Sequence, residues 1–193
     1  ADELQVLTPT RRGDAGTRSL NFALQAALNP PKPGKQERRF GELIFREGDR
    51  VMQTRNDYDV VWQKEDGTAG TGIFNGDVGK IAKIDPSGEL LEIVFDDRTA
   101  TYTSDMLAEL DMAYAMTVHK AQGSEYRGVV FVGAPCAPSL MVRGVLYTAI
   151  TRARELLVIV GDDSAVNKMA ENDRRSRRYS GLKWRLRKGG EEK

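Results

Sequence analysis

The sequence is poor in the side chains that carry covalent and metal chemistry. Its 193 residues include one cysteine and one histidine, and aromatic residues make up only 7%. A single cysteine permits no internal disulfide. Cys136 lies between Pro135 and Ala137, a setting that favours an inert thiol over a nucleophile or a metal ligand. The sequence therefore predicts no disulfide scaffold and no metal site.

Long apolar runs are also missing. No stretch of ~18 apolar residues could span a bilayer, and no short apolar segment near Ala1 resembles a signal peptide. We therefore expect a cytoplasmic protein without a membrane partner. Because 40% of the residues are hydrophobic and 30% are charged, the chain can form one full α/β domain, or one domain with a small insertion.

The sequence lacks the glycine-rich loop with which many enzymes hold nucleoside triphosphates. No G-x-x-x-x-G-K-[ST] pattern occurs, because the Gly-Lys pairs at 34–35 and 79–80 are followed by glutamine and isoleucine. The apolar stretch Leu91 to Asp97 imitates a magnesium-holding strand that ends in acids. Since Arg98 continues a hairpin pattern, we interpret this stretch as a strand and a β-turn. Together with alanine at position 1, the missing loop predicts that the chain is one part of a longer protein.

Charge is balanced overall and uneven along the chain. The 29 Lys/Arg and 28 Asp/Glu give a net charge of +1, which disfavours a generally basic DNA-coating protein. Residues 174–188 nevertheless contain eight Lys/Arg and no acid. A second basic cluster lies in a loop rich in proline and glycine and comprises Lys32, Lys35, Arg38 and Arg39. Each cluster fits either nucleic-acid phosphate or an ordinary solvated face.

The first half of the chain changes from an α/β pattern to a β pattern. An apolar run from Leu4 to Leu7, followed by helical spacing from Ser19 to Leu28, predicts a strand, a loop and a helix. Short alternating segments separated by turn residues then follow at 50–54, 78–84, 90–95 and 99–103. They predict a small SH3-like β-barrel over residues 47–109. The composition of Gly67 to Gly72 predicts a mobile loop within it.

The strand and helix alternation returns from Asp111. We expect strands at 112–116, 129–133 and 156–161, and helices from Thr117, over 139–150 and from Ser164. Strands that alternate with helices favour a doubly wound parallel sheet. The predicted fold class is thus α/β, with a parallel-sheet domain formed by residues 1–46 and 110–193 and interrupted by the β-barrel at 47–109.

The segment 117–125, T-V-H-K-A-Q-G-S-E, joins the carboxyl end of a predicted strand to a helix start. Ligands bind at that edge of open α/β sheets, and a helix start offers unpaired N–H groups to an anion. Thr117 could cap the helix and face a phosphate, while Lys120 adds positive charge and Gln122 a two-sided hydrogen bonder. The alternative is an ordinary capped helix with a solvated polar face.

The segment 146–154, L-Y-T-A-I-T-R-A-R, places two arginines at the end of an otherwise apolar helix. An arginine held there could present its planar fork to a phosphate supplied by another domain, as arginine fingers do. The alternative is a cation that offsets the dipole at the helix C-terminus.

These segments, taken in order, carry a family resemblance. The matching stretches are L-T-P-T-R-R-G at 7–13, G-D-R-V-M-Q-T-R-N-D-Y at 48–58, F-N-G-D-V-G at 74–79, the 117–125 segment, 147–154 and R-Y-S-G-L at 178–182. Over nearly the whole chain they resemble the C-terminal half of RecD-type DNA helicases of superfamily 1. The resemblance implies a second RecA-like motor domain with an SH3-like insertion, in an enzyme that moves 5′ to 3′ on single-stranded DNA using ATP.

The resemblance also implies roles for individual residues. Arg152 would contact the γ-phosphate and is the expected catalytic residue. The expected ATP-binding residues are Arg11, Arg12, Gln122, Gly123, Glu125 and Arg152. The expected DNA-binding residues are Gln53, Asn56, Thr117, His119 and Lys120. Because Arg11 and Arg12 are adjacent, either could be the second γ-phosphate contact. The N-terminal motor domain of the same chain would hold most of the ATP and Mg.

We therefore predict the C-terminal half of an ATP-dependent DNA helicase, with roles in DNA repair and recombination, that is inactive alone because it has no P-loop. We expect the grip on single-stranded DNA to rest mostly on backbone charge and polar contacts and therefore to be salt-sensitive. The low aromatic content predicts sparse base stacking. One alternative is a non-enzymatic nucleic-acid-binding module that uses the barrel and the basic tail. Another is an interaction adaptor that uses the barrel alone. Neither alternative explains Arg152 or Gln122.

Overall fold

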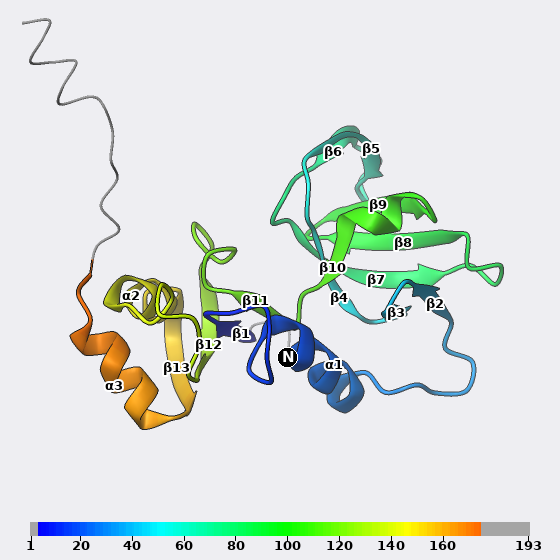
Figure 1. The fold of residues 1–193 in the computed structure, drawn as a ribbon. Coiled ribbons are helices and arrows are strands. Elements are labelled where there is room, and N and C mark those ends of the chain that lie inside the picture. Colours follow the sequence, from blue (N-terminus) through cyan, green and yellow to red (C-terminus); the bar gives the residue numbers. More distant parts are fainter. Residues whose placement is uncertain (1–3, 175–193) are drawn as a thin grey trace, which may run out of the picture.

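The computed structural model describes residues 4–174. The predicted basic tail beyond Arg174 and the matching stretch 178–182 lie outside the described residues. Three sheets form within the described part: a four-stranded parallel sheet, a seven-stranded antiparallel sheet and a two-stranded hairpin. The antiparallel sheet is inserted between the first helix and the second strand of the parallel sheet (Figure 1). The predicted α/β fold with a parallel sheet and an inserted β module is therefore confirmed.

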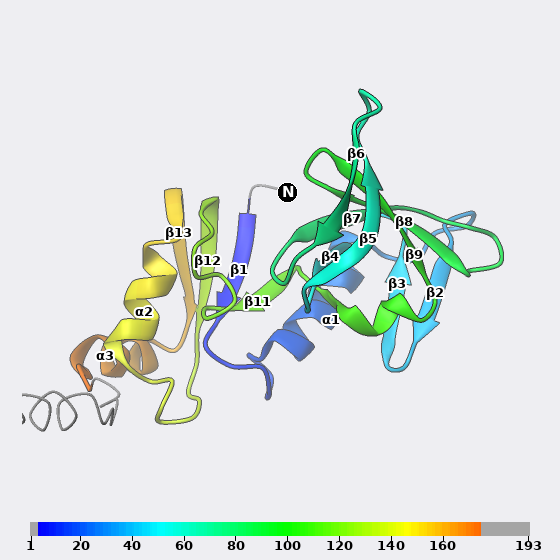
Figure 2. The same ribbon diagram turned by 90° about the horizontal axis from the view of Figure 1, so that it is seen from above.

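The parallel sheet has the strand order β11-β1-β12-β13. Its strands are β1 (Leu4–Thr8), β11 (Ala115–Thr117), β12 (Tyr126–Gly133) and β13 (Ala153–Gly161). Helices α2 (Arg143–Ile150) and α3 (Asp163–Glu171) pack together beside β12 and β13, whereas α1 (Thr17–Leu28) lies beside β11 (Figures 1 and 2). No helix within residues 4–174 is long and apolar enough to cross a membrane.

The antiparallel sheet has the order β10-β4-β7-β8-β9-β5-β6. Its strands are β4 (Arg50–Gln53), β5 (Asp57–Gln63), β6 (Ala69–Ile73), β7 (Val78–Ile84), β8 (Leu90–Phe95), β9 (Arg98–Thr103) and β10 (Leu110–Met112). A short 3-10 helix, η1 (Met106–Glu109), precedes β10. Alternate residues such as Leu91, Ile93 and Phe95 are buried, as a half-buried strand requires. Phe95 pairs with Arg98 across a two-residue turn, which confirms the predicted hairpin.

Two predicted loops are strands. Residues 69–72 of the stretch expected to be mobile belong to β6, which pairs with β5. Gly70 lies under the Trp62 ring, where an added Cβ would be 2.5 Å from a ring carbon, so the glycine permits the pairing. The basic loop also contains a hairpin of β2 (Glu37–Phe40) and β3 (Leu43–Arg46). Both predictions were wrong because glycine and charge obscure the strand alternation.

The predicted strand 112–116 is split between two sheets. Its first part is β10 of the antiparallel sheet and its second part is β11 of the parallel sheet. The Asn21 side chain on α1 holds the break, because its amide nitrogen donates to Met112 O and Ala115 O while its oxygen accepts from Ala115 N. The predicted helix from Thr117 is also wrong, since 118–123 form successive turns.

Helix α2 begins four residues later than predicted. Its start is set by Asn172 after α3, whose side chain donates to Met141 O at 2.7 Å and whose carbonyl accepts from Arg143 N at 2.7 Å. These bonds hold 141–143 in an extended approach to the helix. The contact comes from residues far along the chain, so the local pattern could not reveal it.

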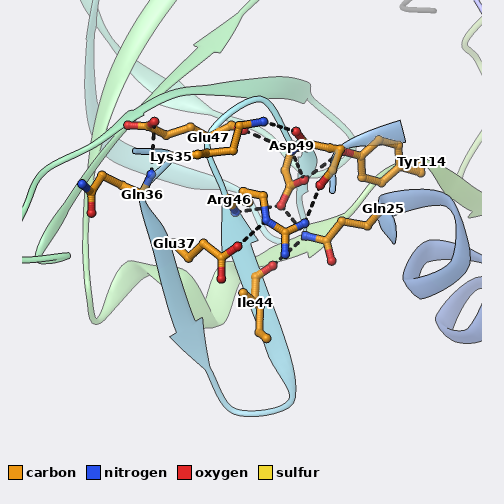
Figure 3. Close-up of polar contacts among 10 residues, drawn as sticks. Gln25, Lys35, Gln36, Glu37, Ile44, Arg46, Glu47, Asp49 and Tyr114 are labelled. Carbon is orange, nitrogen blue, oxygen red and sulfur yellow. Dashed lines mark hydrogen bonds and ion pairs between the residues drawn. The ribbon is translucent and has the colours of Figure 1, made fainter. Parts of the chain in front are cut away.

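Helix α1 buries amides where its sequence spacing predicts apolar contacts. Asn21, Gln25 and Asn29 follow each other at intervals of four and are buried, while Phe22 is 44% and Leu28 60% exposed. The Gln25 amide donates to the fully buried Asp49 carboxylate at 2.5 Å (Figure 3). The Asn29 amide donates to the other oxygen of the same carboxylate at 2.7 Å. Helix α1 is therefore tied to the start of β4 by polar contacts.

Asp49 is the centre of this junction. Besides the two amides, the Tyr114 hydroxyl and the Arg46 backbone N–H donate to its carboxylate, both at 2.8 Å (Figure 3). A buried carboxylate is costly unless its oxygens are satisfied, and four donors meet that need here. The network fixes the antiparallel sheet against α1, which runs beside β11.

Candidate functional site

The first group of predicted site residues lies at the carboxyl edge of the parallel sheet. Thr8 of β1 pairs with Thr117 of β11, so both strands end side by side. The Lys120 N–H donates to the Thr117 carbonyl at 2.9 Å and lies 3.4 Å from its hydroxyl. Val118 and Ala121 are buried and anchor the turn, while His119 is exposed. The turn thus presents polar groups outward, as expected for a helix cap, although no regular helix follows.

Two arginines and an acid share this edge with Lys120. Arg11 Nη2 lies 3.9 Å from Asp111 Oδ2. The pKa of Lys120 is lowered first by burial and then by the nearby charge of Arg11, while Asp111 raises it. The Arg12 guanidinium makes no ion pair or hydrogen bond with any described residue. The edge therefore gathers positive charge around one carboxylate.

A second group lies at the amino edge of the same sheet. β13 begins at Ala153 opposite Tyr126, and the Tyr126 N–H donates to the Arg152 carbonyl at 2.8 Å. The Arg152 guanidinium donates to Ser124 O at 2.9 Å and to Thr148 O and Thr151 Oγ1 at 3.3 Å each. All three acceptors are neutral, so Arg152 is held in place and keeps its full charge.

Arg154 differs from Arg152 in its partner. Its Nε donates to the Glu125 carboxylate at 2.8 Å, and both side chains are exposed. The structure thus adds a physical difference between the two arginines of the 146–154 segment, of which only the family resemblance had selected Arg152. Gly123 and Glu125 flank Ser124 and complete the group. The φ of +90° at Gly123 favours glycine at that position.

The two groups are separated by the length of the sheet. Leu7 pairs with Phe131, which is five residues along β12 from Tyr126, so the edges are roughly 16 Å apart at ~3.3 Å per residue. Arg11 and Arg12 lie at the Thr117 edge and are not brought together with Arg152. The segment 117–125 runs from one edge to the other and contains residues of both groups.

The two predicted DNA-binding residues Gln53 and Asn56 differ in burial. Gln53 is fully buried, donates to Glu109 Oε2 at 2.9 Å and accepts from the Tyr102 hydroxyl at 3.0 Å. Asn56 is exposed, and its side-chain oxygen accepts from the Asn75 N–H at 3.0 Å. Only Asn56 of this pair is accessible to a ligand.

Sequence reasoning missed the exposed aromatic residues near Asn56. Tyr58 and Phe74 form an edge-to-face pair with ring centroids 5.6 Å apart, and both are exposed. Their only signal was that they belong to the N-D-Y and F-N-G stretches. Aromatic pairs on a surface are suited to contact another planar or apolar group.

A cavity of about 600 Å³ was also missed. It lies between α1, the β2–β3 hairpin and the η1–β10 segment, next to the carboxyl edge. Three arginines, two phenylalanines and two acids are among its lining residues: Arg11, Arg12, Arg18, Phe22, Phe40, Glu42 and Asp111. No grouping of His, Cys, Asp and Glu within residues 4–174 is suited to a metal ion.

Comparison with known proteins gives two family matches that follow this architecture. The family described as ATP-dependent RecD-like DNA helicase SH3 domain matches residues 20–95, and the UvrD-like helicase C-terminal domain matches residues 112–160. The ATP-dependent RecD2 DNA helicase of Deinococcus radiodurans is 38% identical over 174 residues, which are 90% of this chain. This chain belongs to the RecD-like helicase family.

Other relatives agree with this assignment. RecBCD enzyme subunit RecD of Mycolicibacterium smegmatis is 31% identical over 192 residues, or 98% of the RecD-like chain. The chain spans 22% of the Deinococcus protein and 30% of the Mycolicibacterium protein. It is homologous to the C-terminal region of these helicases, which confirms the resemblance predicted from the motifs.

Two solved structures share the fold of the RecD-like chain. Bacteroides Pif1 bound to ssDNA has a TM-score of 0.53 and 16% identity, with 97% of this chain and 46% of that chain covered. The Pif1 helicase of Candida albicans has a TM-score of 0.51 and 15% identity, with 94% and 49% covered. At these identities the likeness concerns the fold alone.

Proposed function

We propose that this chain is the second motor domain of an ATP-dependent helicase that moves 5′ to 3′ on single-stranded DNA. Residues 1–46 and 110–193 form the motor domain, and residues 47–109 form the inserted barrel. The observation that carries the proposal is the setting of Arg152. Three neutral oxygens hold its guanidinium beside Ser124, and no carboxylate within residues 4–174 pairs with it. This is the arrangement that an arginine finger requires.

At the amino edge, Arg152 is the catalytic residue. Its planar fork stabilises negative charge on the γ-phosphoryl oxygens as the phosphoryl group is transferred. Gln122, Gly123 and Glu125 accompany it as the ATP-binding residues of this half. The P-loop that holds ATP and Mg belongs to the N-terminal motor domain of the same protein, so residues 1–193 alone do not hydrolyse ATP.

At the carboxyl edge, Thr117, His119 and Lys120 hold the backbone of single-stranded DNA. Asn56 contributes from the barrel, whereas the buried Gln53 supports its loop. The family resemblance implies that Arg11 or Arg12 contacts the γ-phosphate. Their position beside Thr117 favours a DNA phosphate instead, and Arg12 is the better placed because its guanidinium has no partner among the residues that the structure describes.

The 117–125 segment provides the coupling between the two edges. Thr117 is fixed to β1 by strand pairing, and Ser124 is fixed to Arg152 by a hydrogen bond. Binding of ATP would draw Arg152 toward the γ-phosphate and would change its hydrogen bond to the Ser124 carbonyl. Because only turns separate Ser124 from Thr117, this change reaches the DNA contacts without passing through the rest of the core.

The test compares the two arginines in the full-length protein. Arg152→Ala should lower ATP turnover by ~10³-fold, the scale of losing an arginine finger. Arg152→Lys should rescue little, because a point charge does not reproduce the fork. Arg154→Ala is the matched control, and turnover should stay within about twofold because this arginine contributes an exposed ion pair. A loss below about fivefold for Arg152→Ala would make it a helix-end charge.

A further inference from the structure

The cavity beside the carboxyl edge combines charge and aromatic surface in an unusual way. Arg11, Arg12 and Arg18 line it together with Phe22 and Phe40. Phe22 is 44% exposed on α1 and Phe40 is 36% exposed next to the turn of the β2–β3 hairpin. Cavities of this size, about 600 Å³, fall within the ~300–1,000 Å³ range of small-ligand sites.

The exposed rings are not explained by the packing of the fold. Helix α1 uses Asn21 and Gln25 for its buried contacts, while the neighbouring Phe22 stays in the cavity wall. Phe40 lies on a two-stranded hairpin outside both larger sheets. Exposing a phenylalanine ring costs apolar burial, so two rings lining one cavity favour a planar or apolar ligand.

The charges of the cavity favour an anion. Arg18 forms an ion pair with Glu42 across the cavity, and Arg11 is 3.9 Å from Asp111. Arg12 has no partner among the described residues, so the three guanidinium groups exceed the two carboxylates by one. An aromatic wall with surplus guanidinium charge suits a nucleobase together with its phosphate.

The cavity is continuous with the DNA-binding edge described above. Arg11 and Asp111 line the cavity. Their charges also affect the pKa of Lys120, which Asp111 raises and Arg11 lowers. Lys120 in turn bonds to Thr117 through its backbone N–H. A strand whose phosphates pass Thr117 and Lys120 therefore reaches the cavity at Arg11 without leaving the protein surface.

We propose that this cavity is a base-binding subsite for single-stranded DNA, in which one unstacked base lies against Phe22 and Phe40 and its phosphate meets Arg12. The subsite rests on the proposed function, because it extends the DNA path at Thr117 and Lys120. It requires no particular base, since every base offers a flat face for stacking. The low aromatic content predicted sparse base stacking in this half, and this proposal assigns such stacking to one cavity.

The test uses the full-length protein without nucleotide and two fluorescein-labelled oligomers, twelve thymidylates and a fully abasic strand of the same length. Phe22→Leu combined with Phe40→Leu keeps apolar bulk and removes both rings. Its affinity for the thymidylate oligomer should fall about tenfold, the scale of one lost base–aromatic stack. Its affinity for the abasic oligomer should stay within twofold. Tyr147→Leu, which removes an exposed ring from α2, is the matched control and should retain the wild-type preference.

Arg12→Ala completes the experiment. It should weaken binding of both oligomers and lower the slope of log affinity against log salt by about 1, whereas Lys83→Ala, at an exposed barrel lysine, should leave the slope unchanged. Thermal melting checks that each variant is folded.

The outcomes separate this proposal from the one on which it rests. If Lys120→Ala weakens binding while the double leucine variant keeps the wild-type preference for bases, the subsite is refuted and the DNA edge stands. If Lys120→Ala changes neither affinity, the DNA edge itself is refuted. Equal loss of base preference in Tyr147→Leu would also overturn the assignment of stacking to this cavity.

Discussion

The two edges of the parallel sheet use arginine differently. At the amino edge, all the oxygens to which Arg152 donates in the described part of the chain are neutral. At the carboxyl edge, Arg11 faces Asp111 and Arg18 is paired with Glu42. A guanidinium held by neutral acceptors keeps its charge for one incoming anion in a fixed geometry, whereas exposed ion pairs exchange partners at little cost. The first setting suits a reacting phosphate and the second suits a moving strand.

The comparison also shows what the two edges share. Both depend on the position of β11 at the edge of the parallel sheet, which Asn21 fixes by its bonds to Met112 and Ala115. The Asp49 network then fixes α1 itself. Damage to this frame should affect both edges, whereas a change within one edge should affect a single function.

The largest expected effect is therefore on the frame. Asp49→Ala leaves four donors without their acceptor, and at ~1 kcal/mol each the free energy of unfolding should fall by about 3–4 kcal/mol. Urea denaturation measures it. Asp105→Ala is the control, because Asp105 is an exposed residue bonded to Thr103, and its loss should stay below about 1 kcal/mol. If the two variants are equally stable, the junction is not a structural centre and both edges rest on something else.

A smaller effect sharpens the assignment of the carboxyl edge. His119 is exposed in the turn after Thr117, so His119→Ala should leave the melting temperature of the full-length protein unchanged. Loss of one hydrogen bond to phosphate or sugar, ~1 kcal/mol, should weaken single-strand affinity about fivefold. A lower melting temperature with unchanged affinity would instead place His119 in the scaffold.

The sequence predicted the elements whose patterns are local. The strands β7, β8 and β9 were found because apolar and polar residues alternate and turn residues separate them. The break between β10 and β11 was missed because it depends on Asn21, some 91 residues before Met112. The inverted burial of α1 was missed for the same reason, since the Asp49 carboxylate that binds its amides lies in another element.

The candidate site shows the same limit. Arg152 could be selected from the order of motifs, but its difference from Arg154 depends on which oxygens surround each guanidinium. Gln53 was expected to bind DNA, yet its buried side chain is hydrogen-bonded to Tyr102 and Glu109. Phe22 and Phe40 carry no motif, and only the fold brings them to one cavity.

The central claim is that one sheet carries ATP sensing at one edge and DNA binding at the other. Its most direct test measures ATP turnover and single-strand affinity in the full-length protein for both Arg152→Ala and Lys120→Ala. Arg152→Ala should lose ~10³-fold in turnover with affinity within about twofold. Lys120→Ala should lose affinity, with a salt slope lower by about 1, and recover near wild-type turnover at saturating DNA. If either variant lowers both quantities to a similar extent while remaining folded, the two functions are not separated as proposed.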